Sequence, residues 1–199
     1  NTTSHNNTTT NNNTNSDMNN ININNNILKH KVVVFSDSMA NRIKHRSFNK
    51  AAHQHLTYFE TFSGATAKSL HHHIIPTLVD QQHETAIIHC GTNDLSPRPN
   101  IVKLDNSQIT KEISEIGDKC TNLGIKNVII SGIIPRKDEV IDQRRKNVNS
   151  VLKSMCLEKG FNYLDNSNIS HDLLWKDGLH LTDPGISAFA NNMIGALNK

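Results

Sequence analysis

Runs of β-branched and apolar residues recur along the chain with amphipathic segments between them, and this alternation constrains the fold most strongly. The clearest run is Lys31–Phe35 (KVVVF), whose continuous apolar pattern is typical of a strand buried on both faces. Further strands are expected over residues 56–62, 85–90, 127–134 and 161–164. Strands that alternate with helices form a parallel sheet covered on both faces. The sequence therefore predicts an α/β fold with about five parallel strands.

Amphipathic segments lie between the expected strands. Apolar residues at helical spacing predict helices over residues 39–45, 65–75, 109–123 and 148–155. We expect Pro76 to end or kink the second of these, because proline lacks the N–H that a helix interior uses. The last helix has the clearest pattern, with Asp183 as its expected cap, Pro184 in its first turn and an apolar stripe from Ile186 to Leu197.

The amino-terminal stretch differs in composition from the rest of the 199-residue chain. Residues 1–26 are almost wholly Asn, Thr and Ser, and such a segment buries too little apolar surface to offset the entropy of ordering it. We therefore expect a disordered tail over residues 1–26 and one folded domain over residues 27–199.

Charge and cysteine content indicate which kinds of partner the chain binds and in which cellular compartment it lies. The net charge is +3 with histidine neutral, and no run of five or more Lys and Arg occurs, so a nucleic-acid-binding face is not indicated. Neither a signal peptide nor a membrane-spanning segment is evident, and Cys90, Cys120 and Cys156 lie in apolar patterns without CxxC spacing. These features predict buried thiols in a cytoplasmic protein. No glycine-rich nucleotide motif follows a strand, so no cofactor is predicted.

Polar residues with catalytic potential follow several of the expected strands. Ser36-Asp37-Ser38 follows the first strand, Gly64 the second and Gly91-Thr92-Asn93-Asp94 the third, while Asp177-Gly178-Leu179-His180 precedes the last helix. Ligands of open parallel sheets bind beyond the carboxyl ends of the strands, near the point where the strand order switches. These segments are therefore expected to meet at one rim of the sheet.

A serine nucleophile needs partners of the kinds found in these segments. Its hydroxyl is weak at neutral pH and needs a base, which in turn needs a group that fixes its tautomer. Ser38 is the candidate nucleophile, His180 the base and Asp177 its orienting partner. Acyl transfer also develops an oxyanion, for which the Ser38 and Gly64 N–H groups and the Asn93 side-chain amide are candidate donors. Taken singly, each residue is more simply a cap or a surface side chain, but the joint pattern predicts a serine hydrolase.

The same residues resemble the motifs of the SGNH hydrolase superfamily, also called GDSL esterases and lipases. The resemblance covers nearly all of the chain from Lys31 onward. The matching positions are the nucleophilic Ser38, Gly64 in FSGATA, Asn93 in CGTND, and Asp177 and His180 in KDGLHLT. The resemblance implies a flavodoxin-like, three-layer α/β/α sandwich and metal-free hydrolysis of carboxylic esters. Such an enzyme would be an acyl esterase, for example a deacetylase, acting on small-molecule, carbohydrate or lipid esters.

One position departs from the family pattern. The first block usually reads Gly-Asp-Ser, whereas this chain has Ser36 in place of the glycine. The spacing of FSDSM, FSGAT and HCGTNDL is also similar to SGNH-type domains of some animal retroelement-like genes. A non-catalytic binding module of this fold within a larger protein is therefore the alternative function.

Three further features admit two interpretations. Trp175 lines an acyl pocket or packs the late loop, and Arg136 contacts substrate or has a surface or salt-bridging role. Consecutive residues such as His71-His72-His73 point about 100° apart on a helix, so these three side chains cannot converge on one ion. They predict a partly exposed helix face, and no metal site is assigned.

Overall fold

The computed structural model of the protein describes residues 29–80, 82–95 and 104–199. The expected disordered tail, residues 1–26, lies outside these ranges. Within them, five strands form one parallel sheet in the order β2-β1-β3-β4-β5. The strands are β1 (His30–Ser36), β2 (His55–Thr61), β3 (Thr85–His89), β4 (Asn127–Ser131) and β5 (Asn162–Leu164). The predicted α/β class is confirmed.

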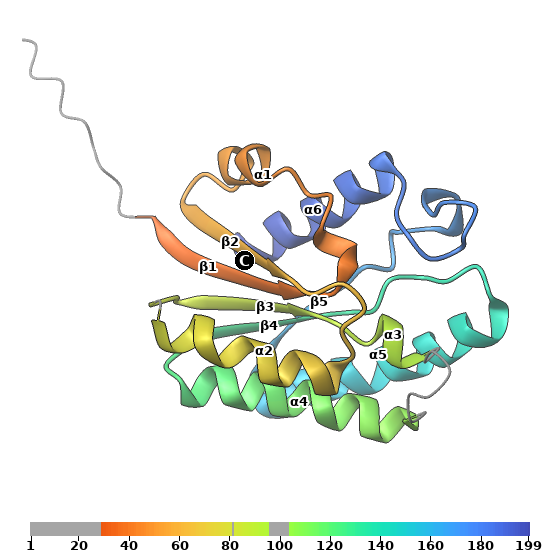
Figure 1. Ribbon diagram of the computed structural model, residues 1–199, viewed down its shortest axis with the longest axis horizontal. Helices are drawn as coiled ribbons and strands as arrows, with labels where there is room; N and C mark the ends of the chain where they lie inside the picture. Colours follow the sequence, from red (N-terminus) through yellow and green to blue (C-terminus); the bar gives the residue numbers. More distant parts are fainter. Residues whose placement is uncertain (1–28, 81, 96–103) are drawn as a thin grey trace, which may run out of the picture.

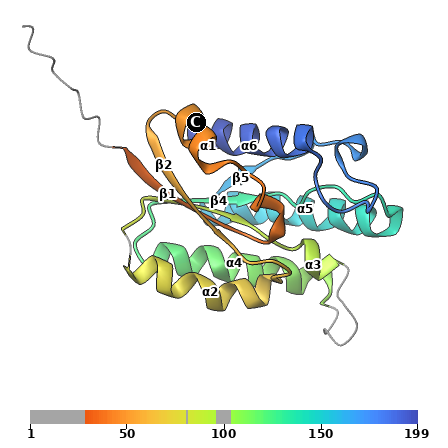
Figure 2. The ribbon, with the colours of Figure 1, turned by 45° about the horizontal axis from the view of Figure 1, so that its top comes forward.

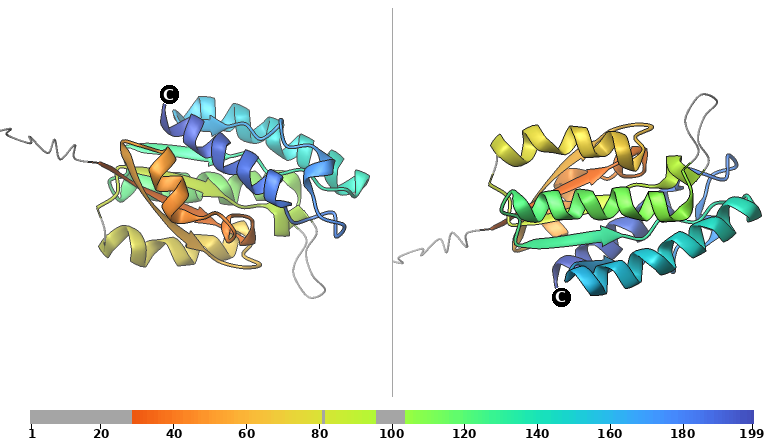
Figure 3. Two further views of the ribbon diagram at one scale, coloured as in Figure 1. Left: turned by 90° about the horizontal axis from the view of Figure 1, so that it is seen from above. Right: turned by 90° about the horizontal axis from the view of Figure 1, so that it is seen from below.

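Helices cover both faces of this sheet. The α-helices are α1 (His45–Ala51), α2 (Ala67–Asp80), α3 (Thr92–Leu95), α4 (Asn106–Asn122), α5 (Glu139–Lys159) and α6 (Asp183–Leu197). Short 3-10 helices occur at η1 (Ser38–Ala40) and η2 (His171–Leu173). One layer consists of α2, α4 and α5, which lie side by side (Figure 3, right). The opposite layer consists of α1 and α6, which gives the three-layer sandwich (Figures 1 and 2).

Alternate residues of the central strands point into two separate cores. Val33 and Phe35 of β1 belong to the core beneath α2, α4 and α5, whereas Val32 and Val34 belong to the core beneath α1 and α6. All four side chains are fully buried, which explains the continuous apolar run in β1. The three cysteines are free and buried, as expected.

The strand order fixes where a ligand would bind. In the order β2-β1-β3-β4-β5 the connections change direction between β1 and β3, as in flavodoxin-like sheets. The chain leaves β1 through Ser36 and Asp37 and leaves β3 through Cys90 and Gly91. Both exits lie at the same rim, which the carboxyl ends of the parallel strands form.

Several element boundaries differ from the sequence-based expectation. Pro76 lies inside α2, because Leu78 beyond it is buried in the core and its packing outweighs the lost hydrogen bond. Thr182, not Asp183, caps α6, with its hydroxyl accepting the Gly185 N–H (3.3 Å). The helix expected over residues 39–45 is wrong, since only η1 forms there and α1 begins at His45.

The fourth strand is also shorter than expected. It ends at Ser131. Beyond it, the Asn149 side chain of α5 accepts the Ile133 N–H (2.8 Å) and donates to the Ile133 carbonyl (2.9 Å). The backbone of Ile133 therefore pairs with this side chain and not with a neighbouring strand among the described residues. Within the described ranges, no helix combines the length and the apolar character that crossing a bilayer requires.

Candidate active site

Ser38 lies just beyond the carboxyl end of β1, as the first residue of η1. Its turn is held by Asp37, whose Oδ1 accepts the Met39 N–H (3.0 Å) and whose own N–H donates to the His89 carbonyl of β3 (3.2 Å). Asp37 is fully buried, whereas Ser38 is half-buried. Burial raises the pKa of Asp37 to about 7. The turn therefore fixes Ser38 at the rim, beside the switch in strand order.

Asp177 and His180 form a hydrogen-bonded pair at the same rim. Asp177 Oδ2 lies 2.7 Å from His180 Nδ1, and Oδ1 accepts the N–H groups of Leu179 (2.9 Å) and His180 (3.0 Å). Burial opposes ionisation of Asp177, but these hydrogen bonds outweigh it and lower its pKa. A carboxylate at Nδ1 assigns the ring proton to that nitrogen and leaves the lone pair at Nε2. This is the tautomer that a general base requires.

Lys137, which the sequence reasoning did not single out, holds the loop that carries this pair. Its ammonium donates to the carbonyls of Leu174 (3.2 Å) and Trp175 (3.0 Å), and its N–H donates to the Gly178 carbonyl (3.1 Å). Gly178 has a φ of 68°, and a Cβ there would lie 2.8 Å from Lys137 Cβ, so glycine is required for this approach. No local pattern marks Lys137, because its partners lie 37 or more residues further along the chain.

Arg42 connects the segment after Ser38 with the segment around His180. Its guanidinium donates to the Leu181 carbonyl (2.9 Å) and lies over the Trp175 ring, 5.9 Å from the ring centroid. The exposed Arg42 side chain therefore joins two segments that are far apart in sequence.

The two halves of the candidate site also interact electrostatically. The positive charge of His180 in its protonated form favours the ionised form of Asp37 and so opposes the effect of burial on the pKa of Asp37. Among the described residues, the His180 imidazole hydrogen-bonds to Asp177 and not to Ser38. The serine and the histidine share the rim without being hydrogen-bonded in this conformation, and such bonds often tighten only when substrate binds.

The candidate oxyanion residue Asn93 is hydrogen-bonded to the loop that contains Gly64. Gly64 lies in the loop after β2, and the Asn93 side chain in α3 donates to the carbonyl of Ala65 in that loop (2.9 Å). The neighbouring Asp94 accepts the Ala67 N–H (2.9 Å), so two consecutive side chains hold the β2–α2 loop. Burial raises the pKa of Asp94. One amide hydrogen of Asn93 is committed to Ala65, and the other remains available as a donor.

The two candidate substrate contacts lie near the Asp177 loop. Trp175 is 48% exposed. Arg136 has a half-buried guanidinium whose Nε is buried without a hydrogen-bond partner among the described residues. Burial lowers the pKa of Arg136, and the charges of Asp138, Asp177 and Asp37 oppose this effect. Of the other interpretation, a surface or salt-bridging role, the salt bridge does not form within the described part of the chain.

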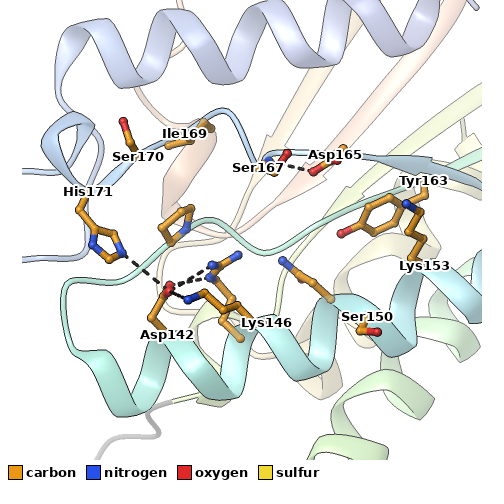
Figure 4. A pocket seen from close by; sticks show the side chains of 13 residues that line it. Asp142, Lys146, Ser150, Lys153, Tyr163, Asp165, Ser167, Ile169, Ser170 and His171 are labelled. Carbon is orange, nitrogen blue, oxygen red and sulfur yellow. Dashed lines mark hydrogen bonds and ion pairs between the residues drawn. The ribbon is translucent and has the colours of Figure 1, made fainter.

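A cavity of about 560 Å³ lies between α5 and the residues that follow β5, and none of the candidate catalytic or oxyanion residues lines it. Asp142 in its wall contacts Arg145 (2.6 Å), Lys146 (3.5 Å) and His171 (3.7 Å) (Figure 4). Asp142 also accepts the Arg136 N–H (3.0 Å). Burial would raise the pKa of Asp142, but the hydrogen bonds lower it to about 2. Asp142 thus connects α5 and η2 with the loop that carries Arg136.

Comparisons with known proteins identify the fold. No protein-family model matches the sequence, and no curated protein matches it significantly. A GDSL-like lipase from Bacteroides thetaiotaomicron is 16% identical, with a TM-score of 0.70 over 84% of this chain and 87% of that one. A variant of an acetylxylan esterase from Geobacillus stearothermophilus is 13% identical, with a TM-score of 0.71 over 84% of this chain and 94% of that one.

A member of the lipolytic G-D-S-L family from Veillonella parvula is 15% identical, with a TM-score of 0.71 over 85% of this chain and 99% of that one. At these identities the likeness concerns the fold. The fold implied by the sequence resemblance is confirmed.

Proposed function

We propose that this chain is a serine esterase that hydrolyses carboxylic esters. The observation that carries the proposal is the 2.7 Å hydrogen bond between Asp177 and His180, formed at the rim that also holds Ser38. A carboxylate-oriented imidazole beside a serine at a strand end has the parts of a nucleophilic hydrolase. The shared fold with lipases and esterases supports the same reaction class.

In the proposed reaction, His180 Nε2 accepts the Ser38 proton as Oγ attacks the acyl carbon, and Asp177 stabilises the resulting imidazolium. The carbonyl oxygen becomes an oxyanion, which the N–H groups of Ser38 and Gly64 and the free amide hydrogen of Asn93 stabilise. Collapse of this intermediate breaks the ester bond, and the imidazolium gives its proton to the departing alcohol oxygen. Water attacks the acyl-enzyme by the same route, releases the carboxylic acid and restores the serine hydroxyl.

We propose a small acyl group, such as acetyl, on the natural substrate. An acetylxylan esterase is among the proteins with this fold. The exposed face of Trp175 would contact the substrate, and the unpaired Arg136 Nε would donate to one of its oxygens.

A fluorophosphonate probe and p-nitrophenyl acetate test the nucleophile. We expect the probe to label the wild-type protein but neither Ser38→Ala nor His180→Ala. For both variants and for Asp177→Asn, kcat/KM should fall by about 10⁴-fold. Ser63→Ala is the control, because Ser63 lies in the loop beside Gly64, accepts a hydrogen bond from the Asn41 side chain (2.9 Å) and takes no step in the proposed reaction. Equal labelling of wild type and Ser38→Ala would refute the proposal.

Ser36 supports a second candidate, a binding module without catalytic activity. Its hydroxyl is buried without a hydrogen-bond partner among the described residues, at the position where the resembled family has glycine. A folded wild-type protein that the probe leaves unlabelled, and that binds single-stranded nucleic acid with strong salt dependence, would favour this candidate.

A further inference from the structure

Three side chains of metal-ligating type meet on the α2–α4 side of the molecule. His71 of α2 and Glu112 and Glu115 of α4 each offer one ligand atom, and these atoms lie within 4.8 Å of one another. All three residues are partly buried. We propose that His71, Glu112 and Glu115 form a binding site for a divalent transition-metal ion, best matched by Zn²⁺.

The packing of α2 against α4 creates this juxtaposition. The two helices lie side by side (Figure 1; Figure 3, right). Glu112 and Glu115 are three residues apart and therefore share one face of α4. His71 reaches them, whereas His72 and His73 are exposed. Consecutive histidines cannot share an ion, but one histidine joined by carboxylates of a neighbouring helix can. Ligand spacing along the sequence gave no sign of a site that two separate helices build.

The donor set fits zinc better than the hard cations. Zn²⁺ binds imidazole nitrogen and carboxylate oxygen at about 2.0–2.2 Å, which places tetrahedral ligand atoms roughly 3.3 Å apart. Rotation of the two flexible glutamates closes the present spacing of up to 4.8 Å. Ca²⁺ and Mg²⁺ prefer oxygen ligands alone, so the histidine argues against them. The two carboxylates balance the charge of the ion, and water would complete the coordination.

The surrounding charges affect the site in two ways. Burial lowers the pKa of His71, with a smaller effect from Lys119, and the charges of Glu115 and Glu112 oppose this effect. Lys111 Nζ lies 3.7 Å from Glu115 Oε1 and competes with a cation. The Lys111 side chain is 76% exposed, so this ion pair is weak and a divalent ion can displace it. A bound ion would connect α2 with α4 and stabilise that layer.

Calorimetric titration of the full, untagged chain with Zn²⁺ tests whether the site binds the ion. The absorbance spectrum with Co²⁺ in place of Zn²⁺ reports the coordination of the bound ion. We expect one Zn²⁺ per chain and a higher thermal midpoint with the ion bound. His71→Ala, Glu112→Gln and Glu115→Gln should each weaken binding by about tenfold or more. His72→Ala, one position along the same helix, is the matched control and should bind as the wild type does.

Two further variants separate this site from the candidate active site. Ser38→Ala should bind Zn²⁺ normally whether or not the chain is an esterase. Glu112→Gln preserves the shape of the side chain, and circular dichroism verifies that each variant is folded. The proposal is overturned if the wild type shows no saturable binding, or if His71→Ala binds Zn²⁺ as tightly as the wild type does. Loss of binding in His180→Ala alone would place the ion at the candidate active site and would also overturn it.

Discussion

Among single residues, Asp37 links the candidate site to the pH dependence of stability. Its carboxyl is fully buried beside Ser38, and burial raises its pKa from 3.8 to about 7. The unfolded chain therefore releases this proton at a lower pH than the folded protein does. Between the two pKa values, 3.8 and about 7, the folded protein binds more protons than the unfolded chain does. The free energy of unfolding therefore falls as the pH rises from about 4 to about 7.

We expect Asp37→Asn to abolish this contribution. Asparagine keeps an oxygen for the Met39 N–H but carries no charge, and a pKa displaced from 3.8 to about 7 corresponds to roughly 4 kcal/mol. Relative to wild type, the variant should therefore gain stability of that order between pH 4 and pH 8. Urea unfolding of both proteins at the two pH values gives the difference, in which contributions from other titrating groups cancel. A difference that does not vary with pH would contradict the assignment.

Lys137 is expected to act as a positioning residue for the proposed esterase. Lys137→Met removes the ammonium that holds the carbonyls of Leu174 and Trp175 but keeps a side chain of similar length. We expect kcat for p-nitrophenyl acetate to fall about tenfold with a smaller change in KM, because the His180 loop loses its orientation. Trp175 is the sole tryptophan, so its emission should also change.

Lys137→Arg is the matched control, because a guanidinium can donate to two carbonyls, and it should restore part of the activity. Wild-type kcat and wild-type emission in Lys137→Met would show that the ammonium does not orient the loop.

Two glycines lie in α6, and we expect replacement by alanine to have opposite effects on stability at the two positions. A Cβ at Gly185 would lie 2.5 Å from the Leu173 carbonyl oxygen, which already accepts hydrogen bonds from Thr182 N–H (2.8 Å) and Oγ (3.0 Å). At Gly195, nothing lies within 4 Å. We expect Gly185→Ala to destabilise the protein by about 1–3 kcal/mol through steric overlap with a fixed backbone.

Gly195→Ala should instead stabilise the protein by about 0.5–1 kcal/mol, since alanine has the higher helix propensity and meets no obstacle. Urea midpoints of the two variants provide the comparison. A stabilising Gly185→Ala would mean that η2 moves freely away from α6.

Local sequence patterns predict those helices and strands whose bounds do not depend on contacts with residues far away in the sequence. The run KVVVF determines β1 because both of its faces are buried, and the resemblance located Asp177 and His180 because three positions separate them. Of the two effects expected of Pro76, an end or a kink, the helix end is wrong, because the burial of residues beyond it has no local signal. Lys137 was missed for the same physical reason, since its role comes from partners that only folding brings near.

In the whole molecule, the sheet lies between two hydrophobic cores and contributes side chains to both. Ile129 and Ile130 are consecutive in β4 and fully buried, and Ile130 faces α2, α4 and α5 while Ile129 faces α1 and α6. Each core therefore packs on the same strand backbone. Loss of either helix layer would expose one face of the central strands to water, so the two layers should unfold together.

Substitution on each face of β4 tests this cooperativity. We expect Ile129→Val and Ile130→Val each to cost about 0.5–1.5 kcal/mol, because each deletes one buried methylene. Their effects should add within about 0.5 kcal/mol in the double variant, since the two side chains occupy separate cores. Urea transitions followed by far-ultraviolet circular dichroism and by Trp175 fluorescence should coincide in every variant, with an unchanged urea dependence. If the two transitions separate in Ile129→Val but not in Ile130→Val, the layer that contains α1 and α6 unfolds independently and the shared sheet does not couple the cores.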